Sequence, residues 1–100
     1  MNIKINDVHF NADQKLVDFI QKKVNKLNTY FDGILSAEVI LKVVKPETAN
    51  NKEVELKLSI PAKDYLFAKK QADTFEEATD MAIEAIRRQL KKFKEKLKEK

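Results

Sequence analysis

Basic side chains gather in the last part of the chain, where they could neutralise phosphate groups. The segment "RRQLKKFKEKLKEK", residues 87–100, holds eight Lys or Arg and two Glu, a net charge of +6. Residues 1–86 carry a net charge of −2. Because local positive charge marks a binding surface better than total charge does, the pattern indicates a surface for an anionic partner. A solvated, Lys-rich helix end would have the same composition, and composition alone does not separate these interpretations.

Residues that could carry out catalysis are scarce. His9 is the only histidine, and a Ser-His-Asp arrangement would need it beside Ser36 or Ser59, which no local pattern indicates. No metal-binding spacing is present, since no histidine lies among the clustered acids Glu76, Glu77, Asp80 and Glu84. One glycine and no cysteine exclude a glycine-rich phosphate loop and a thiolate site. We therefore expect no enzymatic activity, metal, cofactor or small-molecule substrate.

A long helix is predicted to position the basic segment. Thr74 is a favoured N-cap residue, and Glu77 three residues later completes a capping box. Apolar residues then recur at helical spacing across residues 75–97: Phe75, Ala78, Ala82, Ile86, Leu90, Phe93 and Leu97. Beside this stripe the helical period stacks a basic row: Arg87, Lys91, Lys94 and Lys98. Arg88 and Lys92 fall further round the helix and should be well exposed.

The charge of this helix is not explained by its dipole alone. The dipole favours bases only within the last turn, whereas Arg87 and Arg88 lie well before it. Glu84 can pair with Arg88 at a spacing of four residues, but few acids remain for the other basic positions. A polyanion would supply the missing negative charge.

A shorter helix is predicted over residues 13–31. Asn11 or Asp13 could cap it, and its apolar stripe consists of Leu16, Ile20, Val24, Leu27 and Phe31. Gly33 is the only glycine, and we expect it to end the helix in a left-handed conformation.

The same helix carries a second basic row. Lys15, Lys22 and Lys26 fall on one line, with Lys23 beside them. Two basic rows on neighbouring helices would form a groove wide enough for a nucleic-acid backbone. Tyr30 at the end of this helix could stack on a base or simply pack at the edge of the core.

Four segments have the alternation of strands: residues 2–6, 37–43, 53–60 and 64–72. Strand 53–60 should bury Val54, Leu56, Leu58 and Ile60 and expose Glu53, Glu55, Lys57 and Ser59. In strand 64–72 either Leu66 and Ala68 or Tyr65 and Phe67 face inward, and the pattern leaves both open. Strands 37–43 and 53–60 should form a hairpin.

The order β-α-β-β-β-α predicts the α+β class, as a two-layer sandwich. One face of a four-stranded sheet is covered by both helices, and the first two strands are parallel. The 100 residues suit one domain. Neither a signal peptide nor a run of about 18 apolar residues is present in the sequence, so we expect a cytoplasmic protein without membrane contact.

Three stretches, "KKVNKLNTYFD", "AEVILKV" and "RRQLKKFKEKL", carry a family resemblance. In this order and spacing the chain resembles the ribosome hibernation-promoting factor family, which includes ribosome-associated inhibitor A, over essentially all 100 residues. The resemblance implies the fold β-α-β-β-β-α, similar to a double-stranded-RNA-binding domain with an extra strand. Because the chain stops after the long helix, the resemblance is to the short form of the family.

The resemblance also implies a function and a set of contacts. Family members bind the rRNA of the small ribosomal subunit in the channel for tRNA and mRNA, and they inactivate idle ribosomes in stationary phase. The family's basic positions fall here on Lys23, Lys26, Arg88, Lys92, Lys94 and Lys96, and Lys22, Arg87 and Lys91 extend the same surface.

Two other functions fit the residues. A general double-stranded-RNA-binding module would bind free duplex RNA as well as ribosomes. A protein adaptor would dock its basic helix on an acidic protein partner.

Overall fold

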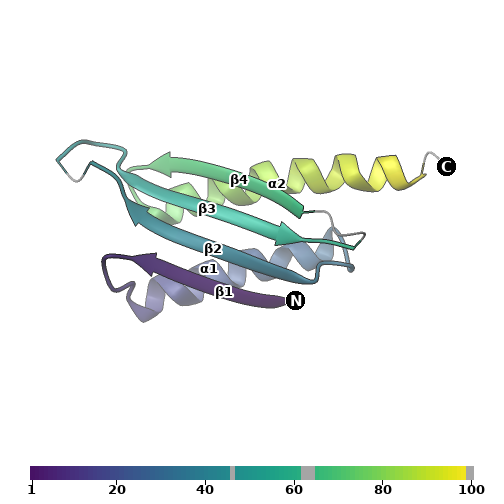
Figure 1. Ribbon diagram of the computed structural model, residues 1–100, viewed down its shortest axis with the longest axis horizontal. Helices are drawn as coiled ribbons and strands as arrows, with labels where there is room; N and C mark the ends of the chain where they lie inside the picture. The colour runs from purple at the N-terminus through teal and green to yellow at the C-terminus, as the bar shows by residue number, and fades with distance from the viewer. Residues whose placement is uncertain (46, 62–64, 99–100) are drawn as a thin grey trace.

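The elements follow in the order β-α-β-β-β-α. The computed structural model describes residues 1–45, 47–61 and 65–98, and its description of side chains ends at Lys96. The strands are β1 (Asn2–Val8), β2 (Ser36–Val43), β3 (Lys52–Ser59) and β4 (Tyr65–Ala72), and the helices are α1 (Gln14–Asn25) and α2 (Phe75–Lys98) (Figure 1). A 3₁₀ helix, η1 (Lys26–Thr29), continues directly from α1. Asp64, the first residue of the predicted fourth strand, lies outside the described residues.

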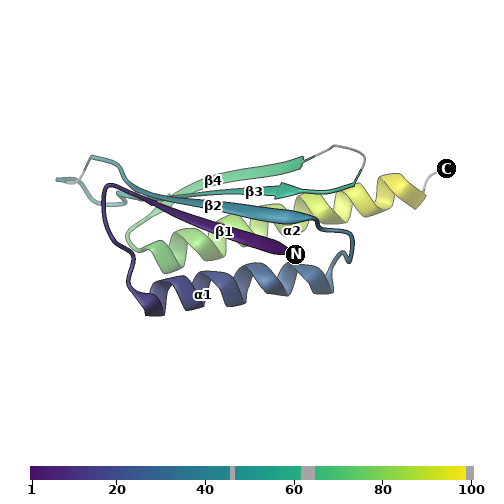
Figure 2. The ribbon, with the colours of Figure 1, turned by 60° about the horizontal axis from the view of Figure 1, so that its bottom comes forward.

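The four strands form one sheet with the spatial order β1-β2-β3-β4. As predicted, β1 and β2 are parallel, and β2 and β3 form an antiparallel hairpin; β4 pairs antiparallel with β3. Both helices lie side by side on one face of this sheet, and the other face is uncovered (Figure 2). The predicted two-layer α+β sandwich is therefore confirmed.

The core lies between the sheet and the two helices. Leu41 and Leu58 on the sheet and Ile20, Ile86 and Leu90 on the helices are completely buried. Cross-strand register brings Val39 opposite Leu56, so neighbouring strands present apolar side chains to the same layer. The helical stripes predicted from spacing are the buried faces of α1 and α2. The side chain of Leu97, the last member of the long stripe, lies outside the described residues.

Both helix starts use the predicted caps. Asp13 accepts a hydrogen bond at Oδ1 from the backbone N–H of Leu16 over 2.8 Å. Thr74 accepts one at Oγ1 from the backbone N–H of Glu77 over 3.0 Å. Each bond satisfies one of the N–H groups that a helix leaves without an internal partner, so each helix begins at the expected residue.

The predicted end of the first helix is wrong. The α-helix stops at Asn25, a 3₁₀ turn follows, and Phe31 lies beyond both. Gly33 has no left-handed conformation, since the only positive φ angles belong to His9, Lys45 and Asn50 among the described residues. A Cβ atom on Gly33 would lie 2.8 Å from Cε2 of Phe31. The glycine is needed because the Phe31 ring, two residues earlier in the chain, packs against its backbone, so the constraint is steric. Phe93 of α2 contacts the same ring from the other helix.

The outer face of the sheet holds one further correction. Glu53 was expected to be solvated, yet only 5% of it is exposed. Its strand, β3, is flanked on both sides, and the register places Lys42 and Gln71 opposite Glu53. Lys69 Nζ lies 3.6 Å from Glu53 Oε1 and balances its charge. The same face holds Tyr65 and Phe67, both exposed, so Leu66 and Ala68 are the inward residues of β4.

Candidate nucleic-acid interface

Residues 87–98 of the basic segment belong to α2. The helix has 24 residues, which span about 36 Å at 1.5 Å per residue. An eight-residue strand spans only about 26 Å, so the last turns of α2 project past the sheet (Figure 1). Phe93 of these turns packs edge-on against Phe31, with ring centroids 5.4 Å apart. This contact and buried Leu90 hold the first half of the basic segment in place.

The basic residues of α2 form two rows with different surroundings. Arg87, Lys91 and Lys94 face the end of α1 and line a hollow there, together with Tyr30 and Glu95. Arg88 lies on the other side of the helix, in a hollow with Lys70, Asp80, Met81, Glu84 and Ala85. Lys92 and Lys96 are exposed. The structure therefore separates the predicted α2 residues into a cleft row, Arg87, Lys91 and Lys94, and an outer row, Arg88, Lys92 and Lys96.

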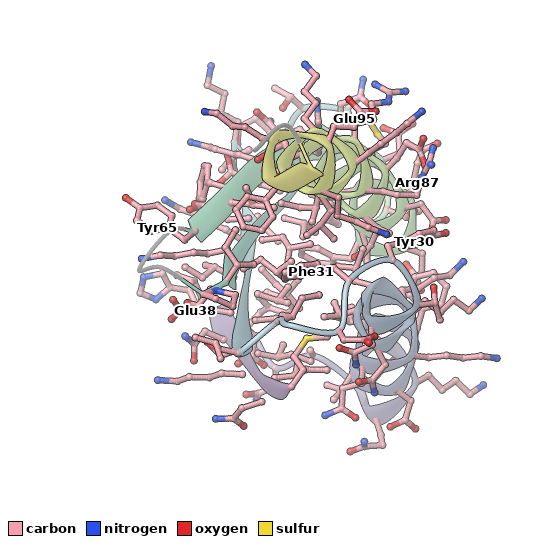
Figure 3. The ribbon with its side chains drawn as sticks, turned by 90° about the vertical axis from the view of Figure 1, so that its right-hand side faces the viewer. Tyr30, Phe31, Glu38, Tyr65, Arg87 and Glu95 are labelled. Atoms are coloured by element: carbon pink, nitrogen blue, oxygen red, sulfur yellow. The ribbon has the colours of Figure 1, made fainter. Side chains whose placement is uncertain are left out.

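Arg87 is paired within the protein. Its Nε donates a hydrogen bond to Glu84 Oε2 over 3.1 Å, and its Nη2 donates a second bond to Glu84 Oε1. This two-point contact fixes the plane of the guanidinium. Arg87 Cζ also lies 5.9 Å from the ring centroid of Tyr30 (Figure 3). The spacing of four residues predicts a pair between Glu84 and Arg88, but Arg88 Nε lies further from this carboxylate, 3.7 Å from Oε1.

These contacts favour the charged forms of both groups. The hydrogen bond from Arg87, and then the charges of Arg87 and Arg88, hold the pKa of Glu84 below its ordinary value. The hydrogen bond to Glu84 raises the pKa of Arg87. Glu84 thus partly neutralises the basic surface at the start of both rows. A spacing of three residues between Glu84 and Arg87 was a sequence signal for this pair.

The basic residues of α1 and η1 also differ in their surroundings. Lys22 of α1 and Lys26 of η1 are exposed. Lys23 is half-buried: its Nζ lies 3.3 Å from Asp80 Oδ1 of α2 and 5.3 Å from the ring centroid of Phe19. Lys23 therefore joins the two helices, a role that sequence spacing within one helix did not reveal.

Tyr30 lies where the two basic surfaces meet. Its side chain is 42% exposed, and it follows η1 directly. The hollow that it shares with the cleft row measures about 260 Å³. A second hollow, of about 450 Å³, is lined by Thr29, Tyr30, Phe31, Asp32, Gly33 and Lys94. Figure 3 shows Tyr30 and Arg87 on the helix side of the molecule, with Tyr65 and Glu38 on the sheet side.

Most basic residues of this surface have no acidic partner. Among the side chains that the structure describes, no carboxylate oxygen lies within 4.0 Å of Lys22, Lys26, Lys91, Lys92, Lys94 or Lys96. Unpaired lysines on two adjacent helices attract a phosphate backbone and release its counterions on binding. The arrangement is suited to binding an anion, and the exposed ring of Tyr30 lies beside these lysines.

Other kinds of site have less support. Within residues 1–45, 47–61 and 65–98, no group of three or more His, Cys, Asp or Glu is placed to hold a metal ion. In the same ranges no helix is long and apolar enough to cross a membrane.

Known proteins share this sequence pattern. Residues 3–98 match the family described as Sigma 54 modulation protein / S30EA ribosomal protein. The ribosome hibernation promoting factor of Pseudomonas putida is 32% identical over 96 residues, which cover 96% of this chain and 89% of that protein. The ribosome hibernation promotion factor of Bacillus subtilis is 29% identical over 101 residues, and this chain spans 52% of its length.

Solved structures share the fold. The crystal structure of the Thermus thermophilus Protein Y N-terminal domain superposes with a TM-score of 0.78 at 26% identity, covering 93% of this chain and 99% of that one. A ribosomal subunit interface protein from Coxiella burnetii superposes with a TM-score of 0.83, covering 94% of this chain and 98% of that one. At 20% identity the latter supports the fold alone.

Proposed function

Because the chain belongs to the Sigma 54 modulation protein / S30EA ribosomal protein family, we propose that it is a ribosome-associated hibernation factor that inhibits translation. The observation that carries this proposal is the match over residues 3–98, shared with relatives named for ribosome hibernation. In this role the protein binds the rRNA of the small subunit in the channel for tRNA and mRNA. It inactivates idle ribosomes in stationary phase by occupying that space.

The contacts in this proposal are mostly electrostatic. The unpaired lysines of α1 and α2 meet phosphates of the rRNA, and each neutralised phosphate releases counterions. Arg88, with 73% of its side chain exposed, contributes in the outer row. Arg87 and Lys23 support the surface from within, since Glu84 and Asp80 already hold them. Specificity comes from the shape of the two-helix layer rather than from reading bases.

Several properties follow from this role. Residues 1–100 act as one ribosome-binding domain, and the protein works by binding and not as an enzyme. A partner in the ribosome places the protein in the cytoplasm. No cofactor is required for the inhibition.

Sedimentation tests this function. Lysate from starved cells that produce the protein is run on a gradient at low and at high salt, and the protein is detected in each fraction. We expect it with small subunits and whole ribosomes at low salt, and in the ribosome-free fraction at high salt, because phosphate contacts weaken with salt. Recovery only in the ribosome-free fraction at low salt would refute the proposal.

Two further measurements separate this function from its rivals. Excess duplex RNA should compete poorly for the protein against small subunits, whereas a general duplex-binding module would be displaced. Partners recovered from lysate should be lost after nuclease treatment, whereas an adaptor for an acidic protein would keep its partner.

A further inference from the structure

Tyr30 is an exposed aromatic ring set among cations. Its neighbours in the hollow are Arg87, Lys91 and Lys94, with one carboxylate, Glu95. A tyrosine that only completes the core would be covered, yet 42% of this residue is exposed. An exposed ring beside basic groups is the combination with which proteins hold single-stranded nucleic acid, because every base has a π-face and every nucleotide a phosphate.

Arg87 contacts the Tyr30 ring, and a hydrogen bond holds the Tyr30 backbone. The guanidinium of Arg87 packs against the ring and is itself fixed by two hydrogen bonds to Glu84. On the chain side, the backbone N–H of Tyr30 donates a hydrogen bond to the carbonyl of Leu27, a fully buried residue, over 3.0 Å. Arg87 is therefore a positioning residue. A ring fixed in this way loses little conformational freedom when it stacks on a base.

Lys91 and Lys94 supply the phosphate contact. Both line the same hollow as the ring, both are exposed, and neither has a carboxylate within 4.0 Å among the described side chains. The hollow measures about 260 Å³. Pockets for drug-sized ligands usually begin near ~300 Å³, so this hollow suits one nucleotide. It is not a groove for a duplex, whose stacked bases present no free faces.

We propose that this hollow binds one unstacked nucleotide of a single-stranded RNA segment, with the base on the Tyr30 ring and the phosphate at Lys91 and Lys94. The inference rests on the proposed function, since it names a contact within the same RNA-binding surface. It predicts that one part of the binding free energy, from stacking, does not depend on salt concentration, whereas the electrostatic part does.

Tyrosine fluorescence provides a direct probe of the proposed contact. Tyr30 and Tyr65 are the only tyrosines, and there is no tryptophan. Tyr65 lies on the opposite, sheet side (Figure 3), so Tyr65→Phe leaves Tyr30 as the only tyrosine fluorophore. We expect a short oligoadenylate to quench its emission, and an adenylate–uridylate duplex of equal length to quench it much less. Equal quenching by the duplex, or no quenching by the single strand while it binds, would overturn the inference. Equal quenching by free adenosine monophosphate would also overturn it, because the site would then be one for free nucleotides.

Substitution at Tyr30 tests the same contact on ribosomes. Tyr30→Leu keeps an apolar side chain without a π-face, and Tyr30→Phe keeps the ring. We expect Tyr30→Leu to weaken ribosome affinity by roughly 5- to 150-fold, the equivalent of one stacked base. The slope of log K against log salt should not change, and Tyr30→Phe should bind nearly as the parent does.

The possible outcomes distinguish this inference from the function it rests on. If the parent binds ribosomes and Tyr30→Leu binds equally well, the nucleotide site is wrong and the function stands. If the parent does not bind ribosomes, the function itself fails. Circular dichroism of Tyr30→Leu checks that its fold is intact, and the fluorescence experiment needs no substitution at Tyr30.

Discussion

The guanidinium carbon of Arg87 lies 5.9 Å from the ring centroid of Tyr30. One residue belongs to α2, and the other follows the 3₁₀ turn that ends the first helical segment. The contact joins the two helices at the place where their basic surfaces meet. The relative positions of the lysines around it therefore depend on this pair and on the Lys23–Asp80 ion pair nearer the start of α2.

Charge reversal in the outer row tests the surface directly. Arg88→Glu with Lys92→Glu should leave the fold intact, because both side chains point away from the buried stripe of α2. Ribosome binding should fall sharply. The slope of log K against log salt should shrink by about 1.4–1.8, the share of two phosphate contacts. The measurement is ribosome affinity across a salt series, with inhibition of cell-free translation followed in parallel.

A matched control separates this effect from net charge. Lys4→Glu with Lys45→Glu makes the same change in charge on β1 and on the β2–β3 loop, away from both helices. It should keep most of the affinity and the inhibition. A folded Arg88→Glu/Lys92→Glu protein with the parent's affinity, slope and inhibition would show that the outer row is a solvated helix surface.

The free energy of unfolding should depend on which face of α2 a substitution changes. Leu90 is completely buried, so Leu90→Ala should reduce the free energy of unfolding by ~2–5 kcal/mol. Lys91, the next residue, is exposed, and Lys91→Ala should change it by no more than about 0.5 kcal/mol. Denaturant unfolding of both variants measures the difference, and equal effects would contradict the assigned buried face.

Replacing Gly33 should destabilise the fold because the new side chain would clash with Phe31, and not because of the backbone conformation of Gly33. The Cβ of Gly33→Ala would lie 2.8 and 2.9 Å from two ring carbons of Phe31 and 3.3 Å from Cγ of Pro61. Displacing a packed ring typically costs about 1–3 kcal/mol, which denaturant unfolding can detect.

A double-mutant cycle checks the cause of this cost. In a Phe31→Leu background the ring is absent, so adding Gly33→Ala should cost clearly less than it does in the parent. A cost that is equal in both backgrounds would mean that the constraint comes from the backbone of Gly33 or from Pro61, and not from the Phe31 ring.

Acid should lower the free energy of unfolding, partly by protonating Glu84. Arg87 lowers the pKa of Glu84 in the folded state, so the folded state favours the ionised carboxylate. The resulting stability is complete above the pKa of the unfolded state and is lost as the pH falls through the lowered folded pKa. Denaturant unfolding from neutral to about pH 3 should show a smaller loss in Glu84→Gln than in the parent.

Sequence reasoning succeeded where one periodicity determines one buried face. The spacing of Ile86 and Leu90 indicated the inner side of α2, and alternation along residues 54–60 indicated the inner side of β3. Both patterns are local and do not depend on which element lies opposite. The caps Asp13 and Thr74 were predictable for the same reason, since each acts on a backbone group three residues away.

The differences arose where a residue's environment comes from a distant segment. Glu53 is buried by neighbours on two other strands, and Gly33 is constrained by the Phe31 ring, which itself packs against Phe93 of α2. In the candidate site, the helical period already separated the row of Arg87, Lys91 and Lys94 from Arg88 and Lys92, but which row lies beside Tyr30 depends on where the first helical segment packs. The pairing of Lys23 with Asp80 joins residues from different helices, and spacing within one helix gives no sign of it.

The sheet order β1-β2-β3-β4 repeats the order of the chain, and this has a consequence for synthesis. Each strand can pair with its predecessor as it emerges from the ribosome, at about 5–20 residues per second. The apolar face of that sheet gains its second helix only after α2 has been made. Tyr30 and the lysines of α1 likewise lack their partners on α2 until then. A nascent chain therefore carries only half of the proposed RNA-binding surface until α2 has folded onto the sheet. Under the proposed function, the chain cannot yet inhibit the ribosome that is making it.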